Sequence, residues 1–282
     1  MSDEHSVTAG IGAGRSRRKN NQPVTATEIQ YIAILGIIVF STLFALNPLV
    51  DIRVSELFWA TGAGFTLTDN EFLVSVRDFH RESTSIIVRL AGLAAILFGL
   101  GMRLHGLVMP HVTLFILATY GLGAGLFVHA LKIGIGRARP NDVVDFGGQQ
   151  LFTPAWQVSD ACSAHCSFIS GEAATAVAML SLAMLFKACW RRTVLAVLVP
   201  FAIFFSVNRV ALGAHFLSDI VIAWLVSGLA MVTLWQVIWQ NAQAIDRAMD
   251  GWIVTACGRA ASLARRQRPW LGAVLQIRLH RT

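Results

Sequence analysis

Charged side chains are scarce in this sequence. Asp, Glu, Lys and Arg make up 14% of its 282 residues, whereas hydrophobic residues make up 55% and the mean hydropathy is +0.60. A soluble domain of this length carries about 25% charged residues. The composition therefore excludes an ordinary soluble domain and indicates a membrane protein with several spans, whose length alone does not set a number of domains.

Internal repeats, heptad arrays and Gly/Ser linkers between domains are also absent. The first apolar run follows the polar stretch 1–28 and has no clear small-x-small cleavage site after it. We therefore expect a membrane span there rather than a cleaved signal peptide.

Six apolar segments are long enough to cross a hydrocarbon core, which needs roughly 20 mostly apolar residues. The fold class that we expect is all-α, a six-span transmembrane helix bundle. The expected spans are 29–48, 84–102, 111–131, 170–188, 193–210 and 217–239.

Most of the Lys and Arg residues lie in four regions of the chain. These are the segment before the first expected span, the connections between the second and third and between the fourth and fifth, and the segment after the sixth. Six spans place all four of these regions on one side, and the positive-inside rule makes that side cytoplasmic. Both termini are then inside, and the net charge of +7 indicates anchoring to anionic lipid rather than nucleic-acid binding.

The chain divides into three expected parts. Residues 1–28 read as a disordered cytoplasmic tail, 29–241 as the transmembrane domain, and 242–282 as a basic cytoplasmic tail. Apolar residues at helical spacing among several Arg favour an amphipathic helix on the inner leaflet for this last part, with an ordinary packed helix as the alternative. In the outer loop 49–83, a short surface helix is expected from Phe72, Val74, Val76 and Phe79.

Three polar motifs fall at the expected outer face. In the first, Lys132, Arg137 and Arg139 precede Pro140. A single lysine at the end of a span is often a snorkelling side chain. Three cations in so few residues instead indicate an anionic partner.

The second motif begins the fourth expected span with Ser170 and Gly171. Ser170 is a suitable N-cap, and the free N–H groups of a helix start bind phosphate well. Simple capping is the alternative. In the third motif, Arg209 precedes His215, and Asp219 follows four residues later. In a helical turn this spacing lets the carboxylate accept from one imidazole nitrogen and leaves the other as a nucleophile or general base; a purely structural pair is the alternative.

Taken together, the motifs surround an oriented histidine with cations and a helix N-terminus, an arrangement typical of a phosphate site that contains a nucleophile. The spacing of Lys132 to Arg139-Pro140, and of Arg209 to His215 and Asp219, resembles the signature of the type-2 phosphatidic acid phosphatase family. This family includes bacterial lipid A phosphatases and prenyl diphosphate phosphatases.

The resemblance implies that His215 attacks phosphorus to form a phosphohistidine and that Asp219 orients it. The substrate phosphate would be bound by Lys132, Arg139, Ser170, Gly171 and Arg209. No metal or other cofactor is implied, because the cations stabilise the charge on the equatorial oxygens.

One position departs from the family pattern. The middle motif usually reads Pro-Ser-Gly-His, and its histidine protonates the leaving oxygen, whereas this chain has Glu172 after Ser170 and Gly171. Glu172 could act as the acid/base or proton-relay group, His165 could supply the proton instead, or a good leaving group could need neither. Glu172 also suits the helix dipole.

Cysteines are few. Cys162 and Cys166 flank His165 in the long outer loop, where a periplasmic location permits a disulfide. Two cysteines and one histidine are too few for a zinc site. Cys189 and Cys257 fall on the inner side and are expected to be free.

The leading functional hypothesis is a bacterial inner-membrane lipid phosphatase with its active site facing the periplasm. Its substrate would be a lipid phosphate or diphosphate, with lipid A favoured slightly over undecaprenyl diphosphate and phosphatidylglycerophosphate. The alternatives are a phosphotransferase between membrane lipids and, from a different class, a non-catalytic lipid-phosphate binding protein or transporter.

Overall fold

In the computed structural model, the described residues are 25–100, 102, 108–163 and 165–249, and they form an all-α fold, as predicted. The α-helices are α1 (Ala26–Leu46), α2 (Leu49–Glu56), α3 (Glu71–Gly99), α4 (Pro110–Ala118), α5 (Val128–Ile135), α6 (Gly171–Met179), α7 (Ala188–Ala211) and α8 (Leu217–Gln240). A π-helical segment, η1 (Thr119–Phe127), joins α4 to α5. The short 3₁₀ segments are η2 (Pro140–Asp142), η3 (Val144–Phe146) and η4 (Leu180–Leu185), and β1 (Trp59–Ala60) pairs with β2 (Gly64–Phe65) in an antiparallel hairpin.

Local sequence explains where several helices begin and end. Thr25 and Glu28 form a capping box at the start of α1, with Glu28 N–H donating to Thr25 Oγ1 at 3.2 Å. Asn70 caps α3 by accepting from the Leu73 N–H at 3.0 Å. Each cap satisfies backbone donors that the first turn of a helix leaves without partners. At a C-terminal end, α5 stops at Gly136, which takes a left-handed conformation with φ +65°.

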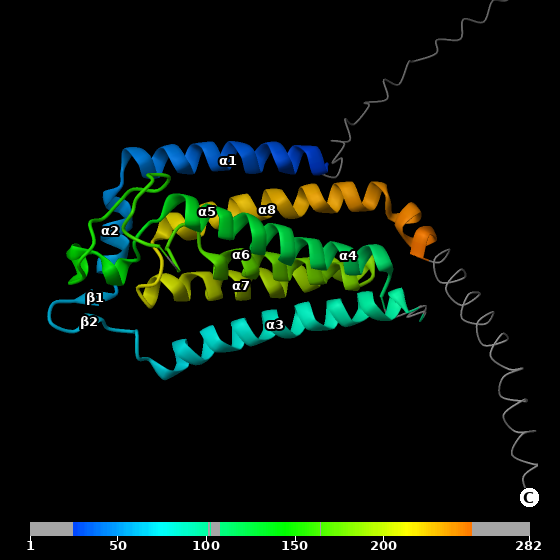
Figure 1. Ribbon diagram of the computed structural model, residues 1–282, viewed down its shortest axis with the longest axis horizontal. Coiled ribbons are helices and arrows are strands. Elements are labelled where there is room, and N and C mark those ends of the chain that lie inside the picture. The colour runs from blue at the N-terminus through cyan, green and yellow to red at the C-terminus, as the bar shows by residue number, and fades with distance from the viewer. Residues whose placement is uncertain (1–24, 101, 103–107, 164, 250–282) are drawn as a thin grey trace, which may run out of the picture.

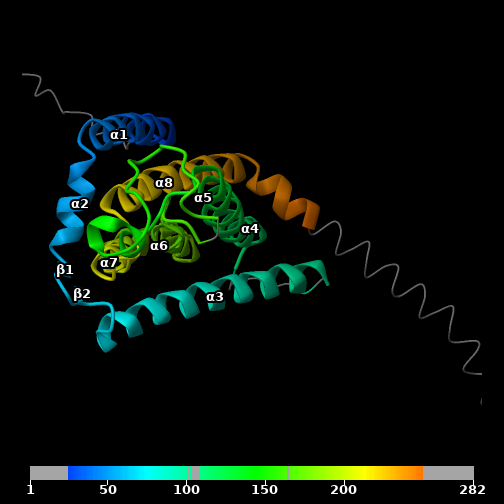
Figure 2. The same cartoon turned by 60° about the vertical axis from the view of Figure 1, so that its left-hand side comes forward.

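The long helices form a bundle with α6 near its centre (Figure 1). α1 lies along α8, whereas α3 runs at an angle along the edge of the bundle (Figure 2). The start of α1 and the end of α8 lie at one end of the bundle, and α2, the hairpin and the loop between α5 and α6 gather at the other (Figure 1). α6 can occupy the centre because small residues let its neighbours approach closely; its buried residues are Ala173, Ala174, Ala176, Val177, Ala178 and Met179.

Five helical segments among the described residues are long and apolar enough to cross a membrane. The fourth span expected at 170–188 is instead α6 followed by η4, an apolar segment that ends at Leu185 and is shorter than the other five. Five of the six predicted spans therefore correspond to helical segments that are long enough to cross a membrane. A helix in the centre of the bundle can be short with little loss of stability, because the surrounding helices and not lipid cover its backbone.

The prediction of a separate surface helix before the second span was wrong. Residues 72–79 and the span expected at 84–102 belong to one continuous helix, α3, which ends at Gly99. No Gly or Pro interrupts Glu71–Ala91, so nothing in this stretch breaks the backbone hydrogen bonds where the composition changes from polar to apolar.

The expected tails fall largely outside the described residues: 1–24 of the first tail and 250–282 of the second. The helix predicted after the last span is helical over 242–249. There Asp246 accepts from the His111 backbone N–H at 3.1 Å, and its other oxygen lies 2.9 Å from His111 Nδ1. This contact joins the residues after α8 to the start of α4.

Candidate active site

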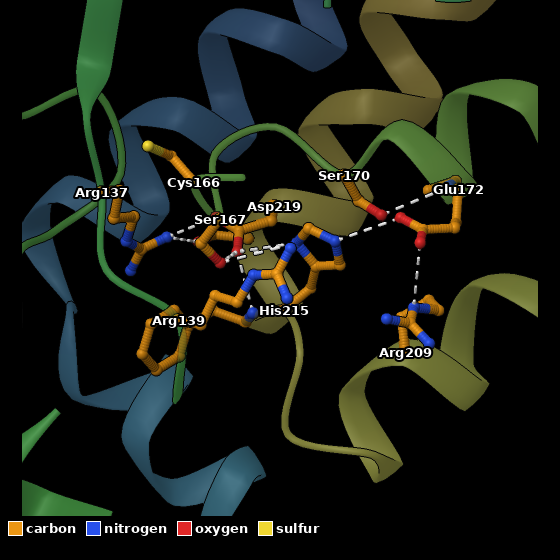
Figure 3. Close-up of polar contacts among 12 residues, drawn as sticks. Arg137, Arg139, Cys166, Ser167, Ser170, Glu172, Arg209, His215 and Asp219 are labelled. Atoms are coloured by element: carbon orange, nitrogen blue, oxygen red, sulfur yellow. Dashed lines mark hydrogen bonds and ion pairs between the residues drawn. The ribbon is translucent and has the colours of Figure 1, made fainter. Parts of the chain in front are cut away.

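Loops and helix ends bring residues of the predicted motifs together (Figure 3). Arg209 lies in the last turn of α7, His215 in the turn that follows, and Asp219 in the first turn of α8. Gly213 makes this turn possible with φ +65°, and a Cβ there would lie 2.0 Å from Asn141 Oδ1. A side chain at this position would therefore strain the backbone and displace a neighbouring loop.

His215 and Asp219 are fully buried, and a serine connects them. Asp219 Oδ2 lies 3.7 Å from His215 Nδ1, too far for a hydrogen bond. Ser167 Oγ donates to that carboxylate oxygen at 2.5 Å and lies 3.5 Å from Nδ1. Because the serine proton goes to the carboxylate, the oxygen is left to accept from Nδ1–H, and Nε2 becomes the reactive nitrogen. The contact predicted between His215 and Asp219 is thus made through Ser167, and no sequence motif singles out this serine.

Asp219 is held from its other side by Arg137. Arg137 Nη1 donates to Asp219 Oδ1 at 2.6 Å, and Nη2 donates to Asp51 Oδ2 at 2.9 Å. Ser218 completes the group, since its backbone N–H and Oγ both donate to Asp51, at 2.8 and 2.6 Å. The guanidinium also lies 4.3 Å from the centre of the Phe216 ring. Burial raises the pKa of the Asp51 carboxyl, and the positive charge of Arg137 opposes that shift.

The contacts of Arg137 with Asp219 and Asp51 change the interpretation of the first motif. Arg137 is fully buried and balanced by two carboxylates, so its charge is directed into the protein. Asp51 comes from α2, and nothing near it in the sequence marked it as a partner.

The other two cations of that motif contact the loop before α6. Lys132 Nζ donates to the Cys166 carbonyl at 2.6 Å, and Arg139 Nε donates to the His165 carbonyl at 2.8 Å. A disulfide joins Cys162 to Cys166 and closes the short loop that carries both carbonyls. The His165 side chain itself is exposed, and its backbone has φ +59°. Of the remaining cysteines, Cys189 is free and exposed, as predicted, and Cys257 lies outside the described residues.

Ser170 is the N-cap of α6, as predicted, and accepts from the Ala173 N–H at 3.2 Å. Gly171 and Glu172 follow in the first turn of α6. The Glu172 carboxylate faces the reactive side of the histidine, with Oε2 3.4 Å from His215 Nε2. Its other oxygen accepts from Arg81 Nη2 at 2.7 Å and lies 3.7 Å from Arg209 Nε.

Arg209 is only 5% exposed, yet its Nε and Nη1 have no hydrogen-bond partner among the described residues. A buried guanidinium normally satisfies its donors, because an unpaired one loses the free energy of hydration. These N–H groups are therefore free to bind an anion beside His215 Nε2.

Arg81 was not predicted as a site residue, because its position 91 residues before Glu172 gives no sign of the contact. Among the described residues, no group of three His, Cys, Asp or Glu side chains is arranged to hold a metal ion.

Comparisons with known proteins found a matching family model and several similar proteins. The model of the PAP2 superfamily matches residues 113–243. A lipid A 4'-phosphatase of Rhizobium leguminosarum is 38% identical over 112 residues, which are 39% of this chain and 48% of that protein. Proteins of the same name from Rhizobium etli and Francisella tularensis subsp. novicida are 34% identical over 113 residues and 30% identical over 109 residues.

These two matches cover 38% of this chain each, and 44% and 49% of the respective relatives. The chain thus spans about half the length of the relatives that it matches. No solved structure matches the chain.

Proposed function

The chain belongs to the PAP2 superfamily through residues 113–243, and on this premise we propose that it is an integral membrane lipid phosphatase. It removes phosphate from a lipid phosphate or diphosphate and forms a phosphohistidine at His215. The observation that carries this proposal is a pair of Arg209 donors that have no hydrogen-bond partner within the described part of the chain. They lie beside the reactive nitrogen of a buried, oriented histidine.

In the first half of the reaction, the phosphate group binds to the free N–H groups of Arg209 and to Lys132 and Arg139. Glu172 Oε2 and His215 Nε2 lie 3.4 Å apart and share one proton, and this proton moves to Glu172 as the dianion arrives. The incoming negative charge offsets the surrounding cations and so makes a proton on Glu172 more stable. Nε2 then attacks phosphorus, the bond from phosphorus to the lipid oxygen breaks, and Glu172 gives its proton to that oxygen.

In the second half, Glu172 takes a proton from a water molecule, which attacks the phosphohistidine. The bond between phosphorus and Nε2 breaks, its electron pair returns to the ring, and inorganic phosphate leaves. Glu172 then returns its proton to Nε2, which restores the resting pair. Nδ1 keeps its proton throughout, so Ser167 and Asp219 stabilise the positive charge that the ring carries as a phosphohistidine.

The substrate that we favour is lipid A. Its support is the name of three similar proteins from bacteria, and the site lies at the end of the bundle, where the phosphate of a bilayer lipid is found. We place this end in the periplasm and the protein in the bacterial inner membrane, on the distribution of Lys and Arg. Undecaprenyl diphosphate and phosphatidylglycerophosphate carry the same reacting group and are the alternative substrates.

The test is phosphate release by the purified full-length protein in detergent from a panel containing lipid A, undecaprenyl diphosphate, phosphatidylglycerophosphate and phosphatidic acid. Release from at least one lipid, together with an acid-labile phosphoenzyme that His215→Ala lacks, is the expected result. Transfer of phosphate to a second lipid without release would favour a phosphotransferase. Binding without either product would favour a non-catalytic binding protein or transporter.

A further inference from the structure

Arg81 lies on α3, outside the segment 113–243 that the family model matches. Two contacts fix the position of this part of α3 against α7. Asn208 Nδ2 donates to the Leu73 carbonyl at 2.9 Å, and the buried ring of His80 stacks on Phe205 with ring centres 4.6 Å apart. One contact lies two turns before Arg81 and the other directly before it, so the direction of its side chain is set by packing.

We propose that Arg81 is a positioning residue that holds Glu172 against the reactive nitrogen of His215. The inference rests on the proposed function. Arg81 binds only Oε1 of the carboxylate, at 2.7 Å, and this leaves Oε2 facing His215 Nε2 at 3.4 Å.

Arg81 also keeps Glu172 away from the phosphate site. The next cation available to Oε1 is Arg209, whose Nε lies 3.7 Å away. Without Arg81, the carboxylate would form a direct hydrogen bond with Arg209 and occupy the donors that the phosphate needs. Arg81 is thus required for Arg209 to stay free while Glu172 stays close.

The charge of Arg81 adds to that of other groups around Glu172. The charged groups around it are Arg77 on α3, Lys132 on α5 and Arg209 on α7. The titratable His80 on α3 and His215 also lie in its surroundings. Each cation favours the ionised carboxylate, which must accept the proton of Nε2. Removing one cation therefore moves the acidic limb of the rate profile to higher pH, because Glu172 then protonates more readily.

The experiment compares Arg81→Met and Arg81→Lys in the full-length protein, with phosphatidic acid as the probe and phosphate release as the readout. Misplacing a catalytic group by about 1 Å can cost roughly 100-fold in rate. We expect Arg81→Met to lower kcat about 10- to 100-fold with a smaller change in KM and to move the acidic limb to higher pH. Arg81→Lys should restore most of the rate and the original limb.

Arg89→Met is the matched control, because Arg89 pairs on the same helix with the exposed Glu82 at 2.6 Å. It should match the wild type. In a Glu172→Gln background, Arg81→Met should cause little further loss, since the two residues act as a unit.

A wild-type kcat and an unmoved acidic limb in Arg81→Met would overturn the inference. It would also be overturned if Arg81→Met lowered kcat as much in the Glu172→Gln background as in the wild type. If Arg81→Met does not fold, Arg81→Gln replaces it and is judged by the same limb and the same double variant. Failure of the proposed function gives a different result, because the wild type itself would then release no phosphate from any lipid of the panel.

Discussion

Glu172→Gln separates chemistry from packing at the one position that departs from the family pattern. The amide keeps the volume of the side chain and one oxygen to accept from Arg81, but it cannot take a proton from His215 Nε2, which lies 3.4 Å from the carboxylate. Arg81 is 53% exposed, so the weakened pair should cost below about 1 kcal/mol of stability.

Loss of general acid–base catalysis has a much larger effect. It slows reactions about 10²–10⁴-fold, which corresponds to roughly 3–5 kcal/mol of activation free energy. The two interpretations of Glu172 therefore differ by several kcal/mol and can be told apart by steady-state rates.

The assay measures phosphate release on two substrates, a phosphatidic acid and a lipid diphosphate. An alkoxide is the poorer leaving group and needs its proton more, so the loss should be larger for phosphatidic acid. Glu82→Gln, the same change on the surface of α3, should leave both rates unchanged. Near-wild-type rates for Glu172→Gln on both substrates would refute a role in proton transfer and leave only the helix dipole. If the leaving-group dependence appears in His165→Ala instead, His165 is the acid.

Three further predictions test the site and its orientation. His215→Ala should abolish turnover and leave the melting temperature and gel-filtration profile near those of the wild type; residual full activity would contradict the phosphohistidine. Arg137→Met should destabilise the fold by about 3–5 kcal/mol, because it leaves the buried carboxylate of Asp51 without its cation, and a thermal shift assay that shows no change would refute this account. In intact cells, a cysteine at position 145 should react with an impermeant thiol reagent and one at position 191 should not; the reverse pattern would place the site in the cytoplasm.

The sequence alone determined the class of the protein and the ends of its last predicted span. The span predicted at 217–239 is α8, Leu217–Gln240, because a long apolar run between polar residues has one low-energy conformation in a bilayer. The motifs around Lys132, Arg139, Ser170 and His215 were also found from spacing, because each one extends over only a few turns of the chain.

Contacts between distant helices were decided only by the tertiary structure. Ser167 bridges His215 to Asp219, Asp51 neutralises Arg137 across 86 residues, and Arg81 reaches Glu172 across 91. Such pairs depend on how helices pack, and a charged side chain at the end of a span has the same local pattern whether it faces water, lipid or a buried carboxylate. Local periodicity therefore found the residues that carry the proposed chemistry, whereas their positions and charge partners required the packed bundle, because a buried charge is stabilised by groups that the chain brings together from far apart.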